Sequence, residues 1–354
     1  MRIAVLGCGA IGGTIAGCLT RAGHDVTPIV GNPRIESALR GNGYTLRDLD
    51  GNVAKVPVSC PPVKTPAEAA GIFDILVTAT PSTALETGLR DMIPFLAETG
   101  RVVTCQNGLP EDRAVGEVGN RVIGCVVGWG ATMSEPGVYQ RTSGGRFQIG
   151  RANASCPAAD DLAPLLQSVA PVEVVNDLSG VRWSKLAINC VTSPFGAIGG
   201  APLGALLMSP KVRRLALEVF AEVAAVARAE QVKLRPVAGT LDIGRVAIND
   251  RERAARLSPT LLLKHLLLLI VGYRFRRMRS SMLYALERGR ALEIDFLNGE
   301  IVRRGARHGV PTPVNSAIVA CVRAIERKEK LSSPQGLGEL CDALSLASVA
   351  AGWR

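Results

Sequence analysis

The stretch RIAVLGCGAIGG, residues 2–13, decides how the first half of the chain folds. Residues 1–6 form a continuous apolar run, which predicts a buried parallel strand, and the glycines that follow make the pattern G-x-G-x-x-G. Residues 14–21 continue at helical spacing up to Gly23, and residues 24–30 predict a second parallel strand. A strand, a glycine turn, a helix and a second strand are typical of a dinucleotide-binding unit.

The glycines of this turn have separate predicted roles. Gly7 permits the tight turn, Gly9 lets a pyrophosphate approach the backbone, and Gly12 lets the helix pack on the strand. The phosphates would then lie against the open amides of the helix N-terminus. We therefore expect cofactor contacts along the whole turn, from Gly7, Cys8, Gly9, Ala10, Ile11 and Gly12.

The end of the second strand indicates which dinucleotide binds. NAD sites usually carry an acidic residue about 20 residues after the glycines. Here residues 29–34 read IVGNPR, with no carboxylate, and Arg34 is suited to pair with a 2′-phosphate. NADP(H) is therefore favoured over NAD(H). The alternative is that Arg34 is only a cation of the loop.

Further apolar strands are predicted at residues 73–79, 101–105 and 121–127, with residues 147–149 as a late edge strand. Strands that alternate with helices in this way predict a doubly wound parallel sheet. Residues 80–83, TPST, and 106–108, QNG, follow strand carboxyl ends, where such sheets bind ligands. Thr80 and Asn107 are therefore candidate binding residues, although Asn107-Gly108 is also an ordinary turn pair.

After about residue 180 the pattern becomes helical. Helices are predicted at residues 182–196, 212–230, 259–273, 282–304 and 313–330, with a loop marked by Pro236, Gly239 and Gly244. The predicted fold is α/β: a Rossmann-type sheet domain over residues 1–180 and an all-α substrate and dimerisation domain over residues 181–330. Residues 331–354 form a tail that is either a terminal helix or a frayed end.

Composition excludes several classes of protein. The chain has 354 residues, 47% of them hydrophobic, and a net charge of +10 that suits anionic ligands. Aromatic residues are only 4%, and the one dense basic cluster is RFRRMR, residues 274–279, which argues against nucleic acid. Nine scattered cysteines without a CxxC pair predict reduced thiols in the cytoplasm and no metal site.

The apolar run of residues 257–273 is the nearest approach to a membrane span. Lys264 and His265 interrupt it, and its uninterrupted part is shorter than the ~20 residues that a bilayer requires. We expect instead a buried helix at a domain or subunit interface.

The segment WSKLAINCVTS, residues 183–193, contains a single charge. Read as a helix, it places Lys185, Asn189 and Ser193 at i, i+4 and i+8 on one face. A surface stripe would carry more charges, and a solitary, partly desolvated ammonium is suited to release its proton. Lys185 is therefore either a catalytic or ligand-binding residue or a structural lysine whose stem is buried.

A second polar cluster lies at residues 280–302, where four polar residues are set among apolar ones: Glu293, Asp295, Asn298 and Glu300. A reductase needs an acid that protonates the carbonyl oxygen and a partner that orients it. Lys185 with a carboxylate would meet both needs. We interpret Asp295 and Glu300 as a solvated helix face, whereas the pattern leaves Glu293 undecided.

These segments resemble the ketopantoate reductase family. The resemblance runs from residue 1 to about residue 325 and is carried by GCGAIGG, KLAINCVTSPFGAI, SSML and EIDFLNGEIVRRGARHGVPTPVN. It implies NADPH-dependent reduction of 2-dehydropantoate to pantoate in pantothenate biosynthesis, a helical domain like that of 6-phosphogluconate dehydrogenase, and a homodimer. By the same resemblance Lys185 protonates the ketone with help from Glu293, Asn107 contacts cofactor and substrate, and Asn189 and Ser281 bind substrate hydroxyl and carboxylate groups.

The chain departs from the family pattern around the pocket and the cofactor. Ser193 replaces an asparagine and Gly196 a threonine, which would leave room for a larger substrate. Other departures are Thr80, Thr83, Ala285 and Gly31. The rivals are therefore a dehydrogenase for another 2-oxo or hydroxy acid and an NADP(H)-binding regulator without turnover. A nucleic-acid binder is the more distant alternative.

Overall fold

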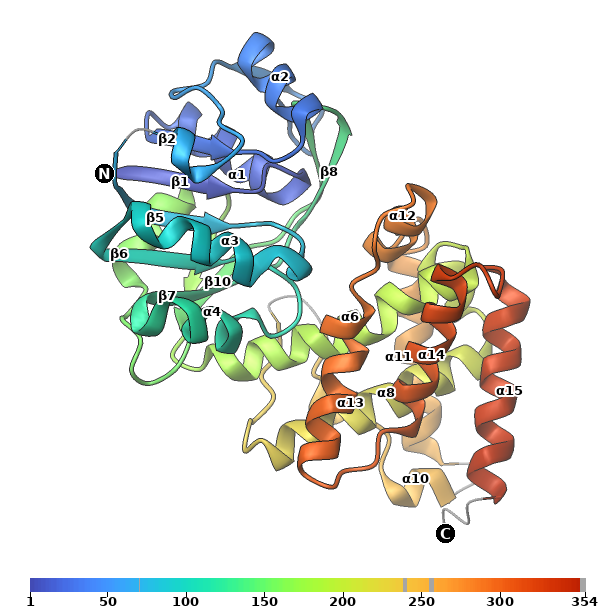
Figure 1. Ribbon diagram of the computed structural model, residues 1–354. Coiled ribbons are helices and arrows are strands. Elements are labelled where there is room, and N and C mark those ends of the chain that lie inside the picture. The colour runs from blue at the N-terminus through green and yellow to red at the C-terminus, as the bar shows by residue number, and fades with distance from the viewer. Residues whose placement is uncertain (70, 238–240, 255–257, 351–354) are drawn as a thin grey trace. The chain divides into compact units, whose positions relative to one another are not determined.

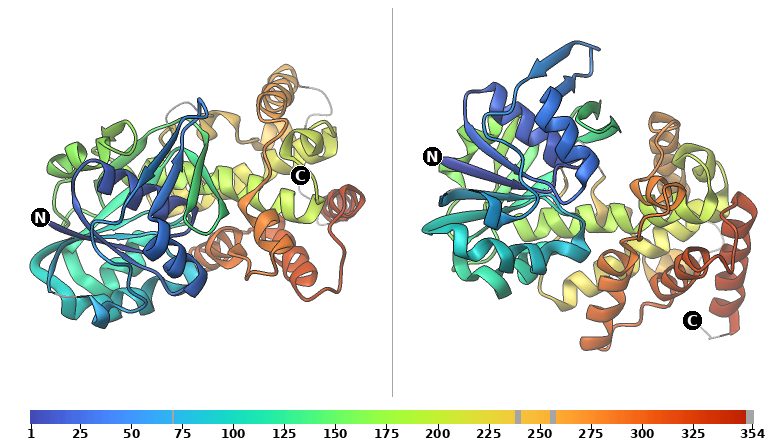
Figure 2. Two further views of the ribbon diagram at one scale, coloured as in Figure 1. Left: turned by 90° about the horizontal axis from the view of Figure 1, so that it is seen from above. Right: turned by 45° about the horizontal axis from the view of Figure 1, so that its top comes forward.

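The computed structural model describes residues 1–69, 71–237, 241–254 and 258–350. The chain divides into two compact units, Met1–Arg182 and Trp183–Arg354, and the division falls inside one long helix. Strands gather in the first unit and helices in the second (Figures 1 and 2). Each unit is described by itself below.

The first unit contains a seven-stranded sheet with the order β11-β10-β7-β6-β5-β1-β2. Strands β2, β1, β5, β6 and β7 are parallel to one another, whereas β10 is antiparallel to β7 and parallel to β11. A doubly wound, predominantly parallel sheet is thus confirmed (Figure 1). The strands are β1 (Arg2–Leu6), β2 (Asp25–Ile29), β5 (Phe73–Thr78), β6 (Leu96–Thr104), β7 (Val122–Val127), β10 (Phe147–Arg151) and β11 (Val172–Val174).

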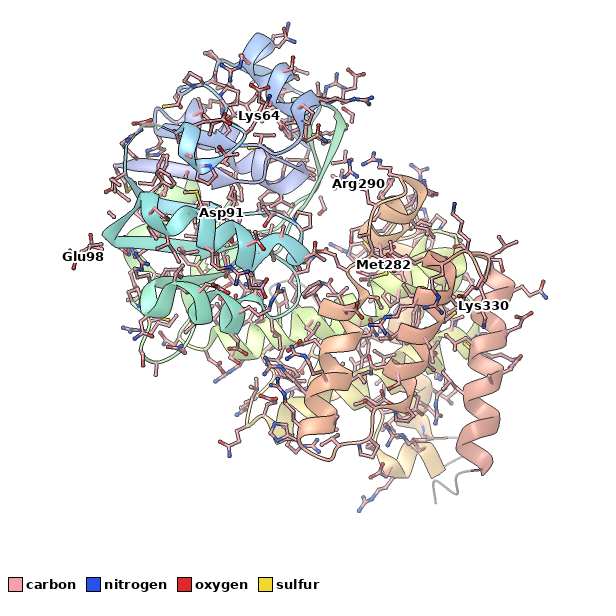
Figure 3. All side chains as sticks on the ribbon, viewed as in Figure 1. Lys64, Asp91, Glu98, Met282, Arg290 and Lys330 are labelled. Carbon is pink, nitrogen blue, oxygen red and sulfur yellow. The ribbon has the colours of Figure 1, made fainter. Side chains whose placement is uncertain are left out.

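Two strand predictions need correction. Residues 147–149 were expected at the edge, but β10 is internal because β11, a strand of three residues too short to predict, pairs with its far side. Strand β6 begins at Leu96 rather than residue 101, and its early residues include the exposed Glu98 (Figure 3).

Helices cover both faces of this sheet, as the alternation along β1 requires. Ile3 and Val5 belong to one apolar core, which also contains residues of α1 and α5, while Ala4 and Leu6 belong to another, formed with α3 and α4. The helices of the unit are α1 (Ala10–Arg21), α2 (Pro33–Asn42), α3 (Leu85–Met92), α4 (Pro110–Val118) and α5 (Ala163–Gln167), with 3₁₀ turns at Pro66–Glu68, Ser82–Ala84, Ile93–Phe95, Gly119–Arg121 and Asp160–Leu162.

A second sheet, which the sequence reading missed, packs on the outer side of α1. Its order is β4-β3-β9-β8, two antiparallel hairpins joined by the parallel pair β3 and β9. The sequence did contain a signal for the two hairpins, namely a glycine in each turn. Gly51 and Gly137 lie at positive φ in these turns. The strands are β3 (Tyr44–Arg47), β4 (Val53–Val56), β8 (Gly130–Glu135) and β9 (Val138–Ser143).

The described residues of the second unit form helices, turns and loops but no strand, which confirms the expected all-α part. The tail forms a helix, α15, in which Leu337 and Cys341 are buried. Of the predicted loop residues, Gly244 lies in α9 and Gly239 lies outside the described residues. The helices are α6 (Leu178–Gly199), α7 (Leu203–Leu207), α8 (Pro210–Ala229), α9 (Ile243–Val246), α10 (Asp250–Ala254), α11 (Pro259–Arg274), α12 (Ser281–Glu287), α13 (Asn298–Arg307), α14 (Pro313–Glu326) and α15 (Pro334–Ala350), with a 3₁₀ turn at Ile294–Phe296.

The single helix predicted over residues 282–304 is wrong. Helix α12 ends at Glu287, because Gly289 adopts a φ of +61° and the Arg290 amide donates back to the carbonyl of Ala285 at 2.9 Å. This is a glycine-terminated helix end. Arg290 beyond it is exposed, and a new helix, α13, begins at Asn298 (Figure 3).

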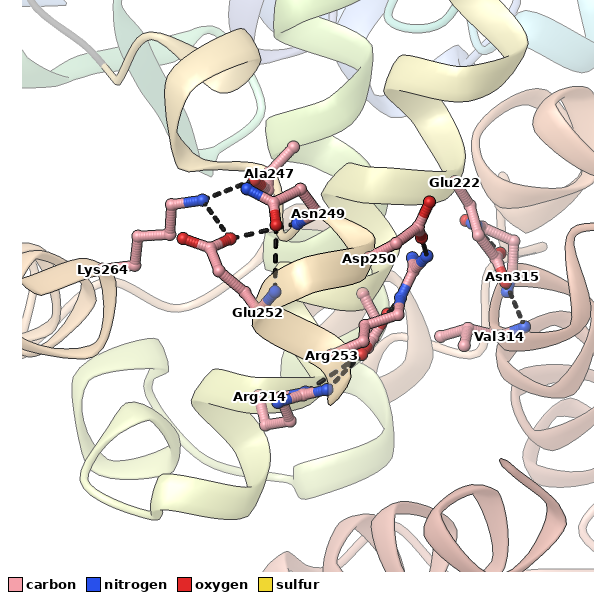
Figure 4. Close-up of polar contacts among 11 residues, drawn as sticks. Arg214, Glu222, Ala247, Asn249, Asp250, Glu252, Arg253, Lys264, Val314 and Asn315 are labelled. Atoms are coloured by element: carbon pink, nitrogen blue, oxygen red, sulfur yellow. Dashed lines mark hydrogen bonds and ion pairs between the residues drawn. The ribbon is translucent and has the colours of Figure 1, made fainter. Parts of the chain in front are cut away.

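Helix α11 is only partly buried within its own chain, so its expected burial at an interface stays a prediction. Leu261 and Leu268 face inward, but five large apolar side chains of α11 are more than half exposed: Leu262, Leu263, Leu266, Ile270 and Tyr273. We call these five side chains the α11 stripe. Lys264 turns away from solvent, and its Nζ donates to Glu252 at 2.6 Å and to the carbonyl of Ala247 at 2.7 Å (Figure 4). Among the described helices, none is both long and apolar enough to cross a bilayer.

Candidate active site

The glycine turn has the geometry of a phosphate cradle. Gly7 adopts a φ of +91°, and a Cβ there would lie 2.8 Å from the Thr80 amide nitrogen. A Cβ on Gly12 would overlap the carbonyl oxygen of Gly7. A Cβ on Gly9, in contrast, would meet no described atom within 4 Å. Gly7 and Gly12 are therefore required by packing, whereas Gly9 faces open space that a ligand can occupy.

The N-terminus of α1 is available to an anion. Gly9 is the N-cap residue, no described side chain caps the helix, and the first turn carries no acidic residue. The first amides of a helix have no partner within the helix, and together they attract negative charge. The turn and helix start therefore fit the pyrophosphate of a dinucleotide.

Tyr139, which the sequence reading missed, supports this turn from the second sheet. Its hydroxyl donates to the carbonyl of Cys8 at 3.0 Å. Its ring occupies the place where a Cβ on Gly13 would stand, so α1 and β9 approach closely. Burial raises the pKa of the Tyr139 hydroxyl and raises that of the Cys8 thiol to about 12, so both groups remain protonated at neutral pH. Cys8 therefore contributes its backbone, not a thiolate.

The loops after β5 and β6 are tied together at the edge where the glycine turn lies. Thr78 donates to Gln106 Oε1 at 3.0 Å, and Gln106 Nε2 donates to Thr80 Oγ1 at 3.4 Å. Thr80 is half-buried beside Gly7, and Asn107 is half-buried directly after Gln106. Gly108 has a φ of +83°, so the Asn107-Gly108 pair does form a turn. The contact of Asn107 with cofactor and substrate stays a prediction.

Arg182 is a buried anchor that the sequence reading also missed. Its side chain is 2% exposed, pairs with Glu111, and donates to the carbonyls of Gln106 and Cys125, both at 3.0 Å. A buried guanidinium is stable only when its donors are paired in this way. Arg182 therefore holds the backbone of the Gln106 loop. The sequence contained a signal for Arg182, namely a charged residue in an apolar run. The same argument singled out Lys185, three residues later.

Arg34 lies in the first turn of α2, directly after β2. The preceding Asn32 caps this helix, since its side-chain oxygen accepts from the amides of Arg34 at 2.9 Å and Ile35 at 3.4 Å. The Arg34 side chain is exposed. Asn32 is thus occupied with the helix, and Arg34 remains the candidate for a 2′-phosphate.

In the second unit, α6 carries Lys185, Asn189 and Ser193 at successive turns. Lys185 and Asn189 are half-buried, while Ser193 is only 5% exposed. The Nδ2 of Asn189 is buried and has no hydrogen-bond partner among the described residues. A buried donor without a partner marks a place where a ligand or an ordered water completes the bonding. Of the three residues on this face, Asn189 is therefore the clearest candidate for a hydrogen bond to a ligand.

The start of α12 packs against α6. Ser280 Oγ donates to the carbonyl of Ser193 at 3.0 Å, and a Cβ on Gly196 would overlap Ser280. The expectation that Gly196 enlarges the pocket is therefore wrong, because Ser280 fills the vacated volume. Ser281 is the first residue of α12 and is exposed. Because its neighbour Ser280 bonds to Ser193, Ser281 lies near the same part of α6.

The three acidic candidates have different environments. Glu293 is half-buried just before the 3₁₀ turn Ile294–Phe296. Asp295 is exposed and pairs with Arg323, in agreement with a solvated face. Glu300 was also expected on such a face, but it is 5% exposed and accepts from Arg304 Nε at 2.6 Å and from Arg303. Glu300 is therefore a structural ion-pair residue.

Comparisons with known proteins agree with this architecture. Residues 3–154 match the sequence profile of ketopantoate reductase PanE/ApbA, and residues 177–326 match the profile of the ketopantoate reductase PanE/ApbA C terminus. A curated 2-dehydropantoate 2-reductase of Mesorhizobium japonicum is 28% identical, over 92% of this chain and 99% of its own length.

Solved structures show the same fold. A PanE/ApbA family ketopantoate reductase from Ralstonia eutropha JMP134 is 30% identical with a TM-score of 0.77, covering 93% of this chain and 99% of that chain. A D-mandelate dehydrogenase solved with NADH and anilino(oxo)acetate also has a TM-score of 0.77 over 93% of this chain and 99% of its own, at 19% identity, which shows a common fold alone. The two matched profiles span most of the chain, which therefore belongs to the ketopantoate reductase PanE/ApbA family of oxidoreductases.

Proposed function

We propose that the protein is a cytoplasmic enzyme that reduces 2-dehydropantoate to pantoate with NADPH, for pantothenate biosynthesis. The observation that carries the proposal is the α6 face. There Lys185 is half-buried one turn from Asn189, whose buried Nδ2 has no hydrogen-bond partner among the described residues. Relatives named 2-dehydropantoate 2-reductase support this substrate. The cytoplasmic location is supported by nine cysteines that form no disulfide.

NADPH is the proposed cofactor because the nucleotide unit fits a phosphorylated dinucleotide. The amides at the start of α1 and the open face of Gly9 would hold the pyrophosphate, and the exposed Arg34 would pair with the 2′-phosphate. Backbone amides of Cys8, Ala10 and Ile11 and the side chain of Thr80 complete the proposed contacts. When bound, NADPH supplies the hydride.

In the proposed reaction Lys185 protonates the ketone oxygen. As the new C–H bond forms at the carbonyl carbon, the C=O π electrons move to oxygen, which takes a proton from the ammonium of Lys185. Glu293 orients Lys185. The donors of Asn189 and Ser281 would hold the substrate's hydroxyl and carboxylate groups, and Asn107 and Ser193 would shape the rest of the site. Atoms and charge balance, since one hydride and one proton are added.

Replacing Lys185 tests this assignment. Loss of a charge-assisted hydrogen bond to the developing alkoxide should raise the barrier by about 3 kcal/mol or more, roughly 150-fold in kcat for Lys185→Ala. The NADPH dissociation constant should stay unchanged. Lys211→Ala is the matched control, because Lys211 is exposed and pairs with the surface Asp342. A Lys185→Ala enzyme with nearly full turnover would sink the assignment.

The choice of substrate and coenzyme needs a separate measurement. Ketopantoate should give the highest kcat/KM in a steady-state comparison with branched and aromatic 2-oxo acids, run with both coenzymes. A preference for a bulkier acid would assign the protein to another dehydrogenase activity of the same fold, whereas tight NADPH binding without any oxidation would indicate a regulator. Arg34→Ala should weaken NADPH binding and leave NADH binding unaffected.

We also propose that the enzyme is a homodimer and that the α11 stripe is the surface that meets a second copy. Five adjacent apolar side chains of one helix are between 52% and 71% exposed. Exposed apolar patches of this kind mark interaction surfaces. The lysine within the helix turns away from the stripe to Glu252, and the guanidinium of Arg276 lies over the ring of Tyr273 at the end of the stripe.

A further inference from the structure

Pro194 lies inside α6 and removes a backbone donor. In an α-helix the amide of each residue donates to the carbonyl four residues earlier, which for position 194 is the carbonyl of Cys190. Proline has no N–H, so this carbonyl cannot receive the bond that position 194 would normally donate. Cys190 is 0% exposed, so water is not freely available to it. A buried carbonyl without a donor is costly, and the structure supplies one from elsewhere.

Asn298 supplies the missing donor from 108 residues away. Its Nδ2 donates to the carbonyl of Cys190 at 2.9 Å and to Asn315 Oδ1, also at 2.9 Å. Asn315 in turn donates from its backbone and its side chain to Glu222 Oε2, at 2.9 and 2.7 Å (Figure 4). Asn298 and Asn315 are 0% exposed. The amide that serves Cys190 is therefore held by a buried network that reaches α14 and α8.

The orientation of the Asn298 amide follows from its partners. Both are oxygen atoms, so the NH₂ group must face them, and both of its hydrogens are used. The Oδ1 of Asn298 has no hydrogen-bond partner among the described residues. An orphaned buried acceptor lowers stability. Position 298 therefore needs a side chain with two hydrogen-bond donors, even at the cost of an acceptor without a partner. Aspartate has no NH₂ group and cannot replace asparagine there.

The Cys190 carbonyl lies in the same part of α6 as the proposed substrate residues. Cys190 follows Asn189 directly, and Lys185 and Ser193 are about one turn away on either side. We propose that Asn298 is a positioning residue of the reduction: it replaces the hydrogen bond that Pro194 removes, and so fixes the part of α6 that presents Asn189 and Lys185 to the substrate. This inference rests on the function proposed above. Asn298 is fully buried and acts through α6 rather than by touching substrate.

A double-mutant cycle between Asn298 and Pro194 tests the proposal. Asn298→Ala and the nearly isosteric Asn298→Asp should both lower kcat/KM for ketopantoate by at least about tenfold, while the NADPH dissociation constant changes less than about twofold. In a Pro194→Ala background the new amide can donate to the Cys190 carbonyl, so Asn298→Ala should cost less than about threefold. An equal loss in both backgrounds would overturn the proposal.

Hydrogen exchange keeps this test separate from the choice of substrate. The amides of residues 191–199 in α6 should exchange faster in the Asn298 variants and recover protection when Pro194→Ala is added. This result is expected even if the protein does not reduce ketopantoate. In that case the proposed function would be wrong, but Asn298 would still stabilise α6. If the α6 amides do not recover protection when Pro194→Ala is added, Asn298 does not stabilise this part of α6. If protection recovers but turnover does not, Asn298 does not position the residues that bind the substrate.

Discussion

At the scale of single residues, the three glycines of the nucleotide turn differ in what holds them. Gly7 is constrained by a positive φ and by the backbone of Thr80, and Gly12 by the carbonyl of Gly7. Gly9 has an ordinary φ of −69° and open space where a Cβ would stand. The protein alone therefore does not need glycine at position 9. A bound dinucleotide does, because a pyrophosphate must approach the backbone closely there.

Gly9→Ala should therefore separate binding from folding. We expect the melting temperature to stay within about 2 °C of the parent, because the methyl group meets no neighbour. The NADPH dissociation constant, followed by fluorescence, should rise by at least about tenfold, since the methyl group would clash with the phosphates.

The matched control is Gly116→Ala in α4, where a Cβ also meets no described atom within 4 Å. It should leave NADPH binding unchanged and should not lower the melting temperature, because alanine has the higher helix propensity. Normal cofactor affinity in Gly9→Ala would contradict the placement of the pyrophosphate at this turn.

At the scale of elements, α3 and α4 are joined by a bidentate ion pair. Arg113 of α4 contacts both carboxylate oxygens of Glu86 in α3, and its Nη2 donates to the carbonyl of Ser82 at 2.6 Å. The pair thus supports the loop that begins at Thr80. The hydrogen bonds from Arg113 hold the pKa of the Glu86 carboxyl below its usual value of 4.5.

This lowered pKa gives the pair a defined pH dependence. A carboxyl whose pKa is lower in the folded state stabilises the fold above its unfolded pKa, and that stabilisation is lost as pH falls through the folded pKa. Glu86→Gln should reduce the free energy of unfolding by about 1 kcal/mol at pH 7, because the pair is partly exposed. In urea unfolding, the difference from the parent should begin to narrow as pH falls below 4.5.

Glu98→Gln serves as the control, because Glu98 is exposed at the start of β6. The free energy of unfolding of Glu98→Gln should match that of the parent both at pH 7 and below pH 4.5. A Glu86→Gln deficit that persists unchanged in acid would show that the loss arises from packing rather than from the charge of the pair.

At the scale of the whole molecule, the α11 stripe is the feature that a single chain leaves unexplained. Leu263 is 65% exposed and Tyr273 is 71% exposed, on a helix whose other face packs on α7 and α8. An apolar stripe of this size destabilises an isolated chain in water, whereas a second copy would bury it.

Leu266→Glu should convert the proposed dimer into a monomer, as measured by light scattering after size exclusion, because burying a carboxylate without a partner in an apolar interface is unfavourable. Leu331→Glu is the control: Leu331 is 87% exposed but lies outside α11, in the segment between α14 and α15. A parent protein that elutes as a monomer, or a Leu266→Glu variant that stays dimeric, would contradict this interface.

The sequence alone determined the features that depend on neighbouring residues. The apolar runs predicted the strands of the main sheet, the glycine pattern predicted the turn after β1, and helical periodicity predicted most of the second unit. Local steric and hydrogen-bonding rules suffice for such features. The break after Glu287 was also a local signal, since Gly289 terminates the helix, but the apolar periodicity on both sides obscured it.

Only the tertiary structure decided which residues far apart in the chain form hydrogen bonds or packing contacts with one another. Tyr139 supports the carbonyl of Cys8 across 131 positions, Asn298 replaces the bond that Pro194 removes, and Ser280 fills the space left by Gly196. Each is a buried hydrogen bond or a packing contact between elements far apart in the chain. No periodicity records such pairs, because their energy depends on which groups the fold excludes from water together.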